Sequence, residues 1–70
     1  MNVAEKLARE ITRVTTIRAN YAALDGKRGL EIKPALWLID LDLERAKRAA
    51  GMDDAVEQIA ALQELEGWQE

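Results

Sequence analysis

Residues 34–50 carry more apolar side chains than one face of a helix can hold, and this feature constrains the fold more than any other. One set is spaced at three and four residues, like a coiled-coil seam; it comprises Leu36, Ile39, Leu43, Ala46 and Ala50. A second set lies on other faces of the same helix: Trp37, Leu38 and Leu41. A helix that is apolar on more than one side is buried on more than one side. We therefore expect the first set to pack inside the chain and the second set to form an interface with another surface.

The rest of the chain is also patterned as helix, because apolar residues recur every three or four positions and do not alternate with period two over any useful length. Glycines and a single proline divide it into three segments, expected at about residues 3–24, 34–50 and 54–66. Asn2 is in position to cap the first helix and Asp53 or Asp54 to cap the third, and Gly26 suits the left-handed residue after the first. The sequence predicts a single all-α domain over residues 1–70. Its expected form is a hairpin-like three-helix bundle, with one long helix, a glycine loop and two shorter helices, completed by oligomerisation.

The first and third helices each show a single apolar stripe. In the first helix it comprises Leu7, Ile11, Val14, Tyr21 and Leu24, with Ile17 beside it. In the third it comprises Ile59, Leu62 and Leu65, begun by Ala55 and Val56. Trp68 is expected to fold back on the third helix after Gly67 ends it. Each of these two helices needs one inward face, so the surplus apolar surface belongs to the second helix.

The chain has 70 residues and contains no histidine, cysteine or serine. It therefore lacks the commonest general base, any thiolate and the serine nucleophile, and no disulfide can stabilise it. A core of this size rarely supplies more than about 3–5 kcal/mol and leaves little room for a substrate pocket. We expect no enzymatic activity and no cofactor. We also expect self-association, with a two-fold dimer as the commonest closed form.

Asp40, Asp42 and Glu44 form the most enzyme-like grouping, because Mg²⁺ prefers carboxylate oxygens. Asp40 and Glu44 share a helix face, but Asp42 lies about 160° from Glu44 around the helix, so the three acids cannot converge. We favour ion pairs of Glu44 with Arg48 and of Asp42 with Arg45 on a solvated face. No metal site is expected.

A basic face is predicted on the first helix and the loop after it; its members are Lys6, Arg9, Arg13, Lys27 and Arg28. Such cations could hold the phosphates of a nucleic acid or of a nucleotide ligand. The competing interpretation, which we favour, is a solvated surface with ion pairs four residues apart, such as Lys6 with Glu10. The loop at residues 25–32 is also too long for a helix-turn-helix, so nucleic acid is not the expected partner.

Tyr21 and Trp37 are aromatic residues near the loop end of the expected hairpin. Aromatic rings can stack on bases, but both residues lie on the apolar pattern, and packing is the simpler role. We place Tyr21 with Trp37, Leu38 and Leu41 as an interface residue.

The sequence shows neither of two features that direct a chain to a membrane. No run reaches the roughly 18 apolar residues of a membrane span. The N-terminal residues lack the apolar core of a secretory signal. We therefore expect a cytoplasmic protein with no membrane partner.

Three stretches of the chain, AEKLAREI at 4–11, IRANYAAL at 17–24 and IAALQELEG at 59–67, resemble short uncharacterised helical proteins of bacteriophages and prophages. This resemblance carries no catalytic or binding residues. It implies an accessory role, such as antagonising a host defence or assisting assembly. We therefore expect a small, non-enzymatic, homo-oligomeric accessory factor that binds a protein partner. Two alternatives stay open, namely an anti-defence sponge that sequesters a nucleotide ligand and a nucleic-acid-binding adaptor that uses the basic face.

Overall fold

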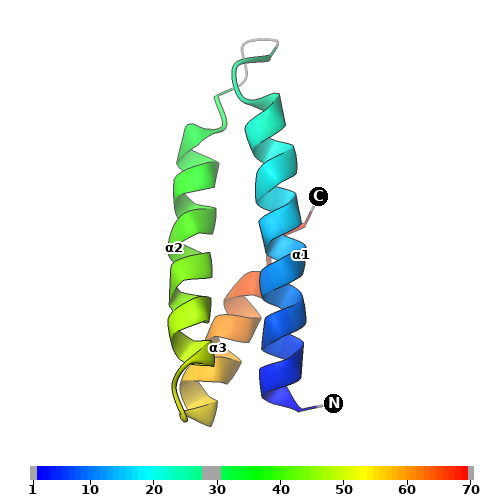
Figure 1. Cartoon of the computed structure of the whole chain (residues 1–70). Coiled ribbons are helices and arrows are strands. Elements are labelled where there is room, and N and C mark those ends of the chain that lie inside the picture. Colours follow the sequence, from blue (N-terminus) through cyan, green and yellow to red (C-terminus); the bar gives the residue numbers. More distant parts are fainter. Residues whose placement is uncertain (1, 28–30, 70) are drawn as a thin grey trace.

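The computed structural model describes residues 2–27 and 31–69, and these form three α-helices without a strand. Helix α1 covers Val3–Leu24, α2 covers Lys33–Ala50 and α3 covers Ala55–Glu66. Helices α1 and α2 run side by side as an antiparallel hairpin, and α3 turns back behind one end of it (Figure 1). All three pairs of helices contact one another. The predicted all-α three-helix bundle is confirmed.

The helix ends follow the local signals in the sequence. The Asn2 side chain accepts a hydrogen bond from the Glu5 backbone N–H at 2.8 Å, and Asp54 accepts from the N–H groups of Val56 and Glu57. Each cap satisfies donors that the first helical turn leaves unpaired. Gly26 has a φ of 80°, the left-handed conformation that favours glycine, directly after the end of α1.

The two connections are held by side chains that bond to the backbone. Before α2, the Asp25 carboxylate accepts a hydrogen bond from the Ile32 N–H at 3.1 Å, which links the two sides of the first connection. After α2, the Gln58 side-chain amide donates to the carbonyls of Ala49 and Met52 at 3.3 and 2.9 Å. These three bonds tie together residues on the two sides of each connection.

The core lies where all three helices meet. Its fully buried members are Leu7, Val14, Ile39, Leu43, Ala46, Ala49, Ala61 and Leu65. Two of the expected stripes are displaced: α2 buries Ala49 rather than Ala50, and α3 buries Ala61 while Ile59 stays 42% exposed. Both buried positions are alanines, whose small side chains take up little space between packed helices, whereas the larger Ile59 stays outside the core.

The molecule is elongated, with extents of 43 × 19 × 16 Å and a radius of gyration of 13.0 Å, against about 11 Å for a compact chain of this length. The 12 residues of α3 span about 18 Å, whereas the 22 residues of α1 span about 33 Å. Helix α3 therefore covers only part of the hairpin. We call the covered part, residues 3–14, 42–50 and α3, the three-helix end, and the rest, residues 17–27 and 31–41, the hairpin end. Among the described residues, no helix is long and apolar enough to cross a membrane.

Candidate functional site

The second apolar set of α2 is exposed on the surface of the molecule. Trp37 is 64% exposed, and Leu38 and Leu41 are each 48% exposed. Trp37 lies two residues before the buried Ile39, which places the two about 160° apart around the helix. All three belong to the hairpin end, which α3 leaves uncovered (Figure 1). We call Trp37, Leu38 and Leu41 the apolar patch.

A groove of about 380 Å³ continues the apolar patch toward the C-terminal end of α2. Its apolar walls come from Leu41 and Ala49 of α2 and from Met52 in the following turn. Four charged side chains line the rest: Glu44, Arg45, Arg48 and Glu57. Since Leu41 belongs to both features, the patch and the groove form one continuous surface.

The charged side chains of the groove differ in how they are paired. Arg45 reaches across to α3, where it meets Glu57 at 3.8 Å and forms a close ion pair with Glu64. The side chains of Glu44 and Arg48 make no hydrogen bond or ion pair with any residue in the described part of the chain. The expected Glu44–Arg48 pair is thus wrong, and the expected Asp42–Arg45 pair is replaced by the links of Arg45 to α3. A cation and an anion are left available beside the apolar patch.

The three acids of α2 take separate roles, as their positions around the helix require. Asp40 forms a close, two-pronged ion pair with Arg18 of α1. The hydrogen bond from Arg18 lowers the pKa of the Asp40 carboxyl below its ordinary value, against a smaller opposing effect of desolvation. Asp42 instead accepts a hydrogen bond from the Trp68 indole N–H at 2.8 Å. Within residues 2–27 and 31–69, no three acidic side chains gather as a possible metal site.

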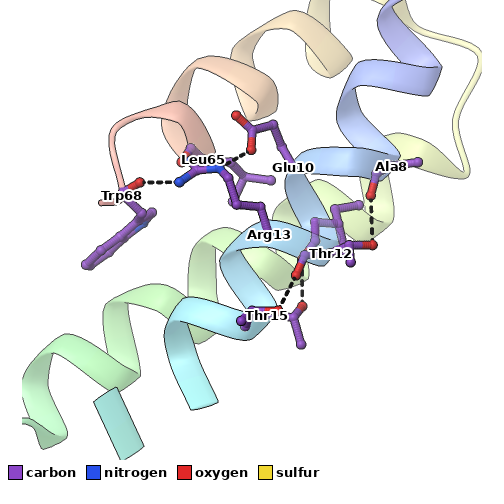
Figure 2. Close-up of polar contacts among 9 residues, drawn as sticks. Ala8, Glu10, Thr12, Arg13, Thr15, Leu65 and Trp68 are labelled. Atoms are coloured by element: carbon purple, nitrogen blue, oxygen red, sulfur yellow. Dashed lines mark hydrogen bonds and ion pairs between the residues drawn. The ribbon is translucent and has the colours of Figure 1, made fainter. Parts of the chain in front are cut away.

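The predicted basic face is divided by the fold, because Arg13 turns toward α3. Its guanidinium donates to the backbone carbonyls of Leu65 and Trp68 at 3.0 and 2.8 Å and pairs closely with Glu10 (Figure 2). The carbonyls at the end of α3 carry partial negative charge, which a cation stabilises. Arg13 therefore holds the end of α3 against α1.

The other members of the basic face stay apart from Arg13. Lys6 and Arg9 line a smaller cavity of about 210 Å³ together with Glu10, Leu62 and Glu66. Lys27 is exposed after the end of α1, and Arg28 lies outside the described residues. Because two acids share the cavity with two cations, the site has no net positive charge with which to attract a phosphate.

Tyr21 is half-buried against the core, and its hydroxyl donates a 2.7 Å hydrogen bond to the Gln69 carbonyl. The structure thus brings Tyr21 to the tail after α3 and not to the apolar patch on α2. Together, Tyr21, Arg13 and Asp42 anchor the tail from both helices of the hairpin. Trp68 does fold back, and its indole N–H donates a hydrogen bond to Asp42 of α2. Gly67, which ends α3, has a φ of −71° and is therefore not in the left-handed conformation.

The pairing of Asp42 with Trp68 was missed by the sequence analysis, although a signal for it was present. At about 100° per residue, Asp42 lies only 60° from the buried Ile39, whereas Glu44 lies 140° away. A half-buried indole N–H requires an acceptor, and Asp42 is the acid of α2 nearest the core.

Comparison with known proteins finds no family model, no curated protein and no solved structure that matches this chain.

Proposed function

We propose that the protein is a non-enzymatic helical interaction module that self-associates through the apolar patch of α2. The observation that carries this proposal is the exposure of Trp37, Leu38 and Leu41 on one helix, next to a groove that continues the same surface. Clustered apolar side chains of this size are typical of interfaces on small proteins. Each Å² of apolar surface removed from water contributes roughly 25 cal/mol.

The size of the chain also favours association. Among the described residues, the core cluster has eight buried members, three of them alanines, and no disulfide supports it. A core of this kind leaves a stability of only about 3–5 kcal/mol. Covering the apolar patch with a partner removes its contact with water and adds to this stability by mass action.

Such a module acts by binding, so we place the protein as a cytoplasmic accessory factor whose oligomer presents a surface to a protein partner. This biological role rests on the resemblance of its helices to phage and prophage proteins. The basic face offers less support for the nucleotide-sponge and nucleic-acid alternatives, since Arg13 is occupied by backbone carbonyls and acids accompany Lys6 and Arg9.

Light scattering coupled to size exclusion, over a range of protein concentrations, tests the proposal. The wild-type protein is expected to elute as an oligomer that dissociates on dilution, and Leu41→Glu is expected to be monomeric and still helical. Ile59→Glu is the matched control, because Ile59 is similarly exposed but lies on α3. A wild-type protein that stays monomeric at high micromolar concentration contradicts the proposal.

Binding measurements on the same protein test the two alternatives, the nucleic-acid-binding adaptor and the nucleotide sponge. A protein that binds nucleic acid by neutralising several phosphates loses at least about 10³-fold in affinity between 50 and 200 mM salt. Binding of labelled nucleic acid with that salt dependence, abolished by Arg9→Ala, would favour the adaptor. A large rise in melting temperature with cyclic nucleotides would favour the sponge.

A further inference from the structure

We infer that the partner of the apolar patch is a second copy of this chain in antiparallel orientation, and that each copy places Trp37 in the groove of the other, against Arg48. The inference rests on the self-association proposed above and specifies its geometry.

The first argument is that the projecting residue and the recess lie on the same face of α2. At about 100° per residue, Trp37, Leu41 and Arg48 lie within about 40° of one another around the helix. Trp37 projects near one end of this face, and the groove beside Arg48 lies near the other. A two-fold interface requires a surface that complements itself, because each patch meets the same patch of its mate. The projecting Trp37 and the groove beside Arg48 lie on one face, so they fulfil this requirement when the two α2 helices are antiparallel.

The second argument is the spacing along α2. Trp37 and Arg48 are eleven residues apart, which corresponds to about 16 Å along the helix axis. A two-fold axis midway between them passes at the level of Asp42 and Leu43. It brings each Trp37 to the level of Arg48 in the other copy and places the two Leu41 side chains near the axis. The apolar patches of both copies are then covered by a single contact.

The third argument is the chemistry of the groove. An indole ring fits comfortably in 380 Å³ and meets the apolar walls formed by Leu41, Ala49 and Met52. The guanidinium of Arg48 lacks a hydrogen bond or ion pair within the described residues, so it is available to stack on the ring. Arginine over tryptophan is the most favourable of the cation–π pairs. The Glu44 carboxylate at the same groove offers an acceptor for the indole N–H.

Cysteine cross-linking tests the orientation directly, since the chain has no cysteine of its own. Lys33 and Asp53 are exposed and lie on either side of the proposed contact. The midpoint between them in the sequence nearly coincides with the midpoint between Trp37 and Arg48, so the same two-fold axis brings Lys33 of one copy close to Asp53 of the other. A short bis-maleimide added to an equimolar mixture of Lys33→Cys and Asp53→Cys should therefore link one variant to the other. Each variant alone should give little cross-linked dimer. Linking of Lys33→Cys to itself, or no linking in a sample that light scattering shows to be dimeric, would overturn this geometry while leaving self-association intact.

Substitutions in the contact test its chemistry. Trp37→Ala should raise the Kd of the dimer at least about 30-fold, as expected for a buried aromatic anchor. Arg48→Ala removes two symmetry-related cation–π contacts and should raise the Kd by roughly 5- to 30-fold. Arg9→Ala, an exposed arginine of α1, is the control and should leave the Kd unchanged. An Arg48→Ala protein that dimerises like the wild type would contradict the stacking. A monomeric wild type would overturn both the inference and the proposed function.

Discussion

The two ends of the molecule use similar side chains in different ways. At the three-helix end, α3 covers the hairpin, and the large apolar residues Leu7, Leu43 and Leu65 are buried. At the hairpin end, two helices have no third to cover them (Figure 1). Leu24, Leu38 and Leu41 stay 45–48% exposed there, and only Ile17 and Ile39 are fully buried among the described residues. The difference is one of coverage and not of composition.

If the apolar patch is the interface proposed above, a short third helix separates stability from recognition. The three-helix end supplies all members of the core cluster except Ile39, and there all three helices pack together. The hairpin end extends the hairpin beyond that core and presents the apolar patch on a rigid helix. An interface on a helix that is anchored elsewhere is preorganised, which lowers the entropic cost of binding.

The largest expected effect is the contrast between a buried and an exposed leucine. Leu65→Ala at the three-helix end should lower the free energy of unfolding by about 3 kcal/mol, because it opens a cavity in a closed core. That is most of the stability expected for a chain of this size. Leu38→Ala at the hairpin end should cost less than about 1 kcal/mol, since its side chain already meets water. Urea denaturation of dilute protein, followed by far-UV circular dichroism, measures both. Equal losses in the free energy of unfolding for the two variants would contradict the difference between the two ends.

The contact of Arg13 with the end of α3 should have the next largest effect. Arg13→Met keeps the length of the side chain but removes the hydrogen bonds to the carbonyls of Leu65 in α3 and of Trp68 just after it. We therefore expect the free energy of unfolding to fall by about 1–3 kcal/mol. Faster amide hydrogen exchange in α3 than in the α1–α2 contact should accompany it. Arg9→Met, one turn earlier and exposed, is the control. Unchanged exchange in α3 would show that Arg13 does not hold the helix in place.

The sequence predicted much of the fold because the signals for helix ends are local. A side-chain cap, a left-handed glycine and a proline in the first turn act on neighbouring backbone groups, so the expected helices match the structure to within one residue. The exposure of Trp37, Leu38 and Leu41 follows from periodicity combined with chain length. Three helices of these lengths can bury only one face of α2.

The polar contacts between helices could not be predicted in the same way. The residue that Arg13 or Asp42 meets depends on the rotation of α3 about its own axis, and α3 turns Ala61 rather than Ile59 into the core. A search for hydrophobic stripes gives such an alanine little weight, so Ile59 was assigned inward. Pairing rules for residues three or four apart likewise ignore competition from a neighbouring helix, which draws Arg45 away from Asp42 toward Glu64.

The two inter-helix turns offer a smaller, matched test of the two ends. Gly26→Ala, in the hairpin end, forces a side chain into the left-handed region at φ 80° and should lower the free energy of unfolding by about 1–2 kcal/mol. Gly51→Ala, at the three-helix end, has φ −86° and places a new Cβ at an ordinary 3.6 Å from the Arg48 carbonyl oxygen. It should be neutral or stabilise the protein by about 0.5 kcal/mol, because alanine lowers the conformational entropy of the unfolded chain. Thermal unfolding of the two variants gives the comparison, and similar melting temperatures would contradict it.

The smallest expected effect is the pH dependence of the ion pair between Arg18 and Asp40, which joins α1 to α2 at the hairpin end. Because the hydrogen bond from Arg18 lowers the pKa of Asp40 in the folded protein, folding favours the ionised carboxyl. The contribution of the pair is therefore complete above the ordinary aspartate pKa of about 3.9 and is lost as the pH falls through the lower folded value. Both side chains are partly exposed, so the effect is small and decreases with added salt.

Asp40→Asn isolates this contribution, because it removes the charge but keeps an oxygen that can accept from Arg18. The difference in urea midpoint between the wild type and Asp40→Asn should be constant from about pH 5 to pH 8. It should decrease as the pH falls below the ordinary aspartate pKa of about 3.9 and vanish once the pH is below the lowered pKa of Asp40 in the folded protein. Glu44→Gln, four residues further along α2 and without an ion pair in the described part of the chain, is the matched control for the loss of a carboxylate from this helix. A difference that persists unchanged into acid would mean that Asp40 acts through packing. In that case the two helices of the hairpin end would be held by Ile17 and Ile39 and not by charge.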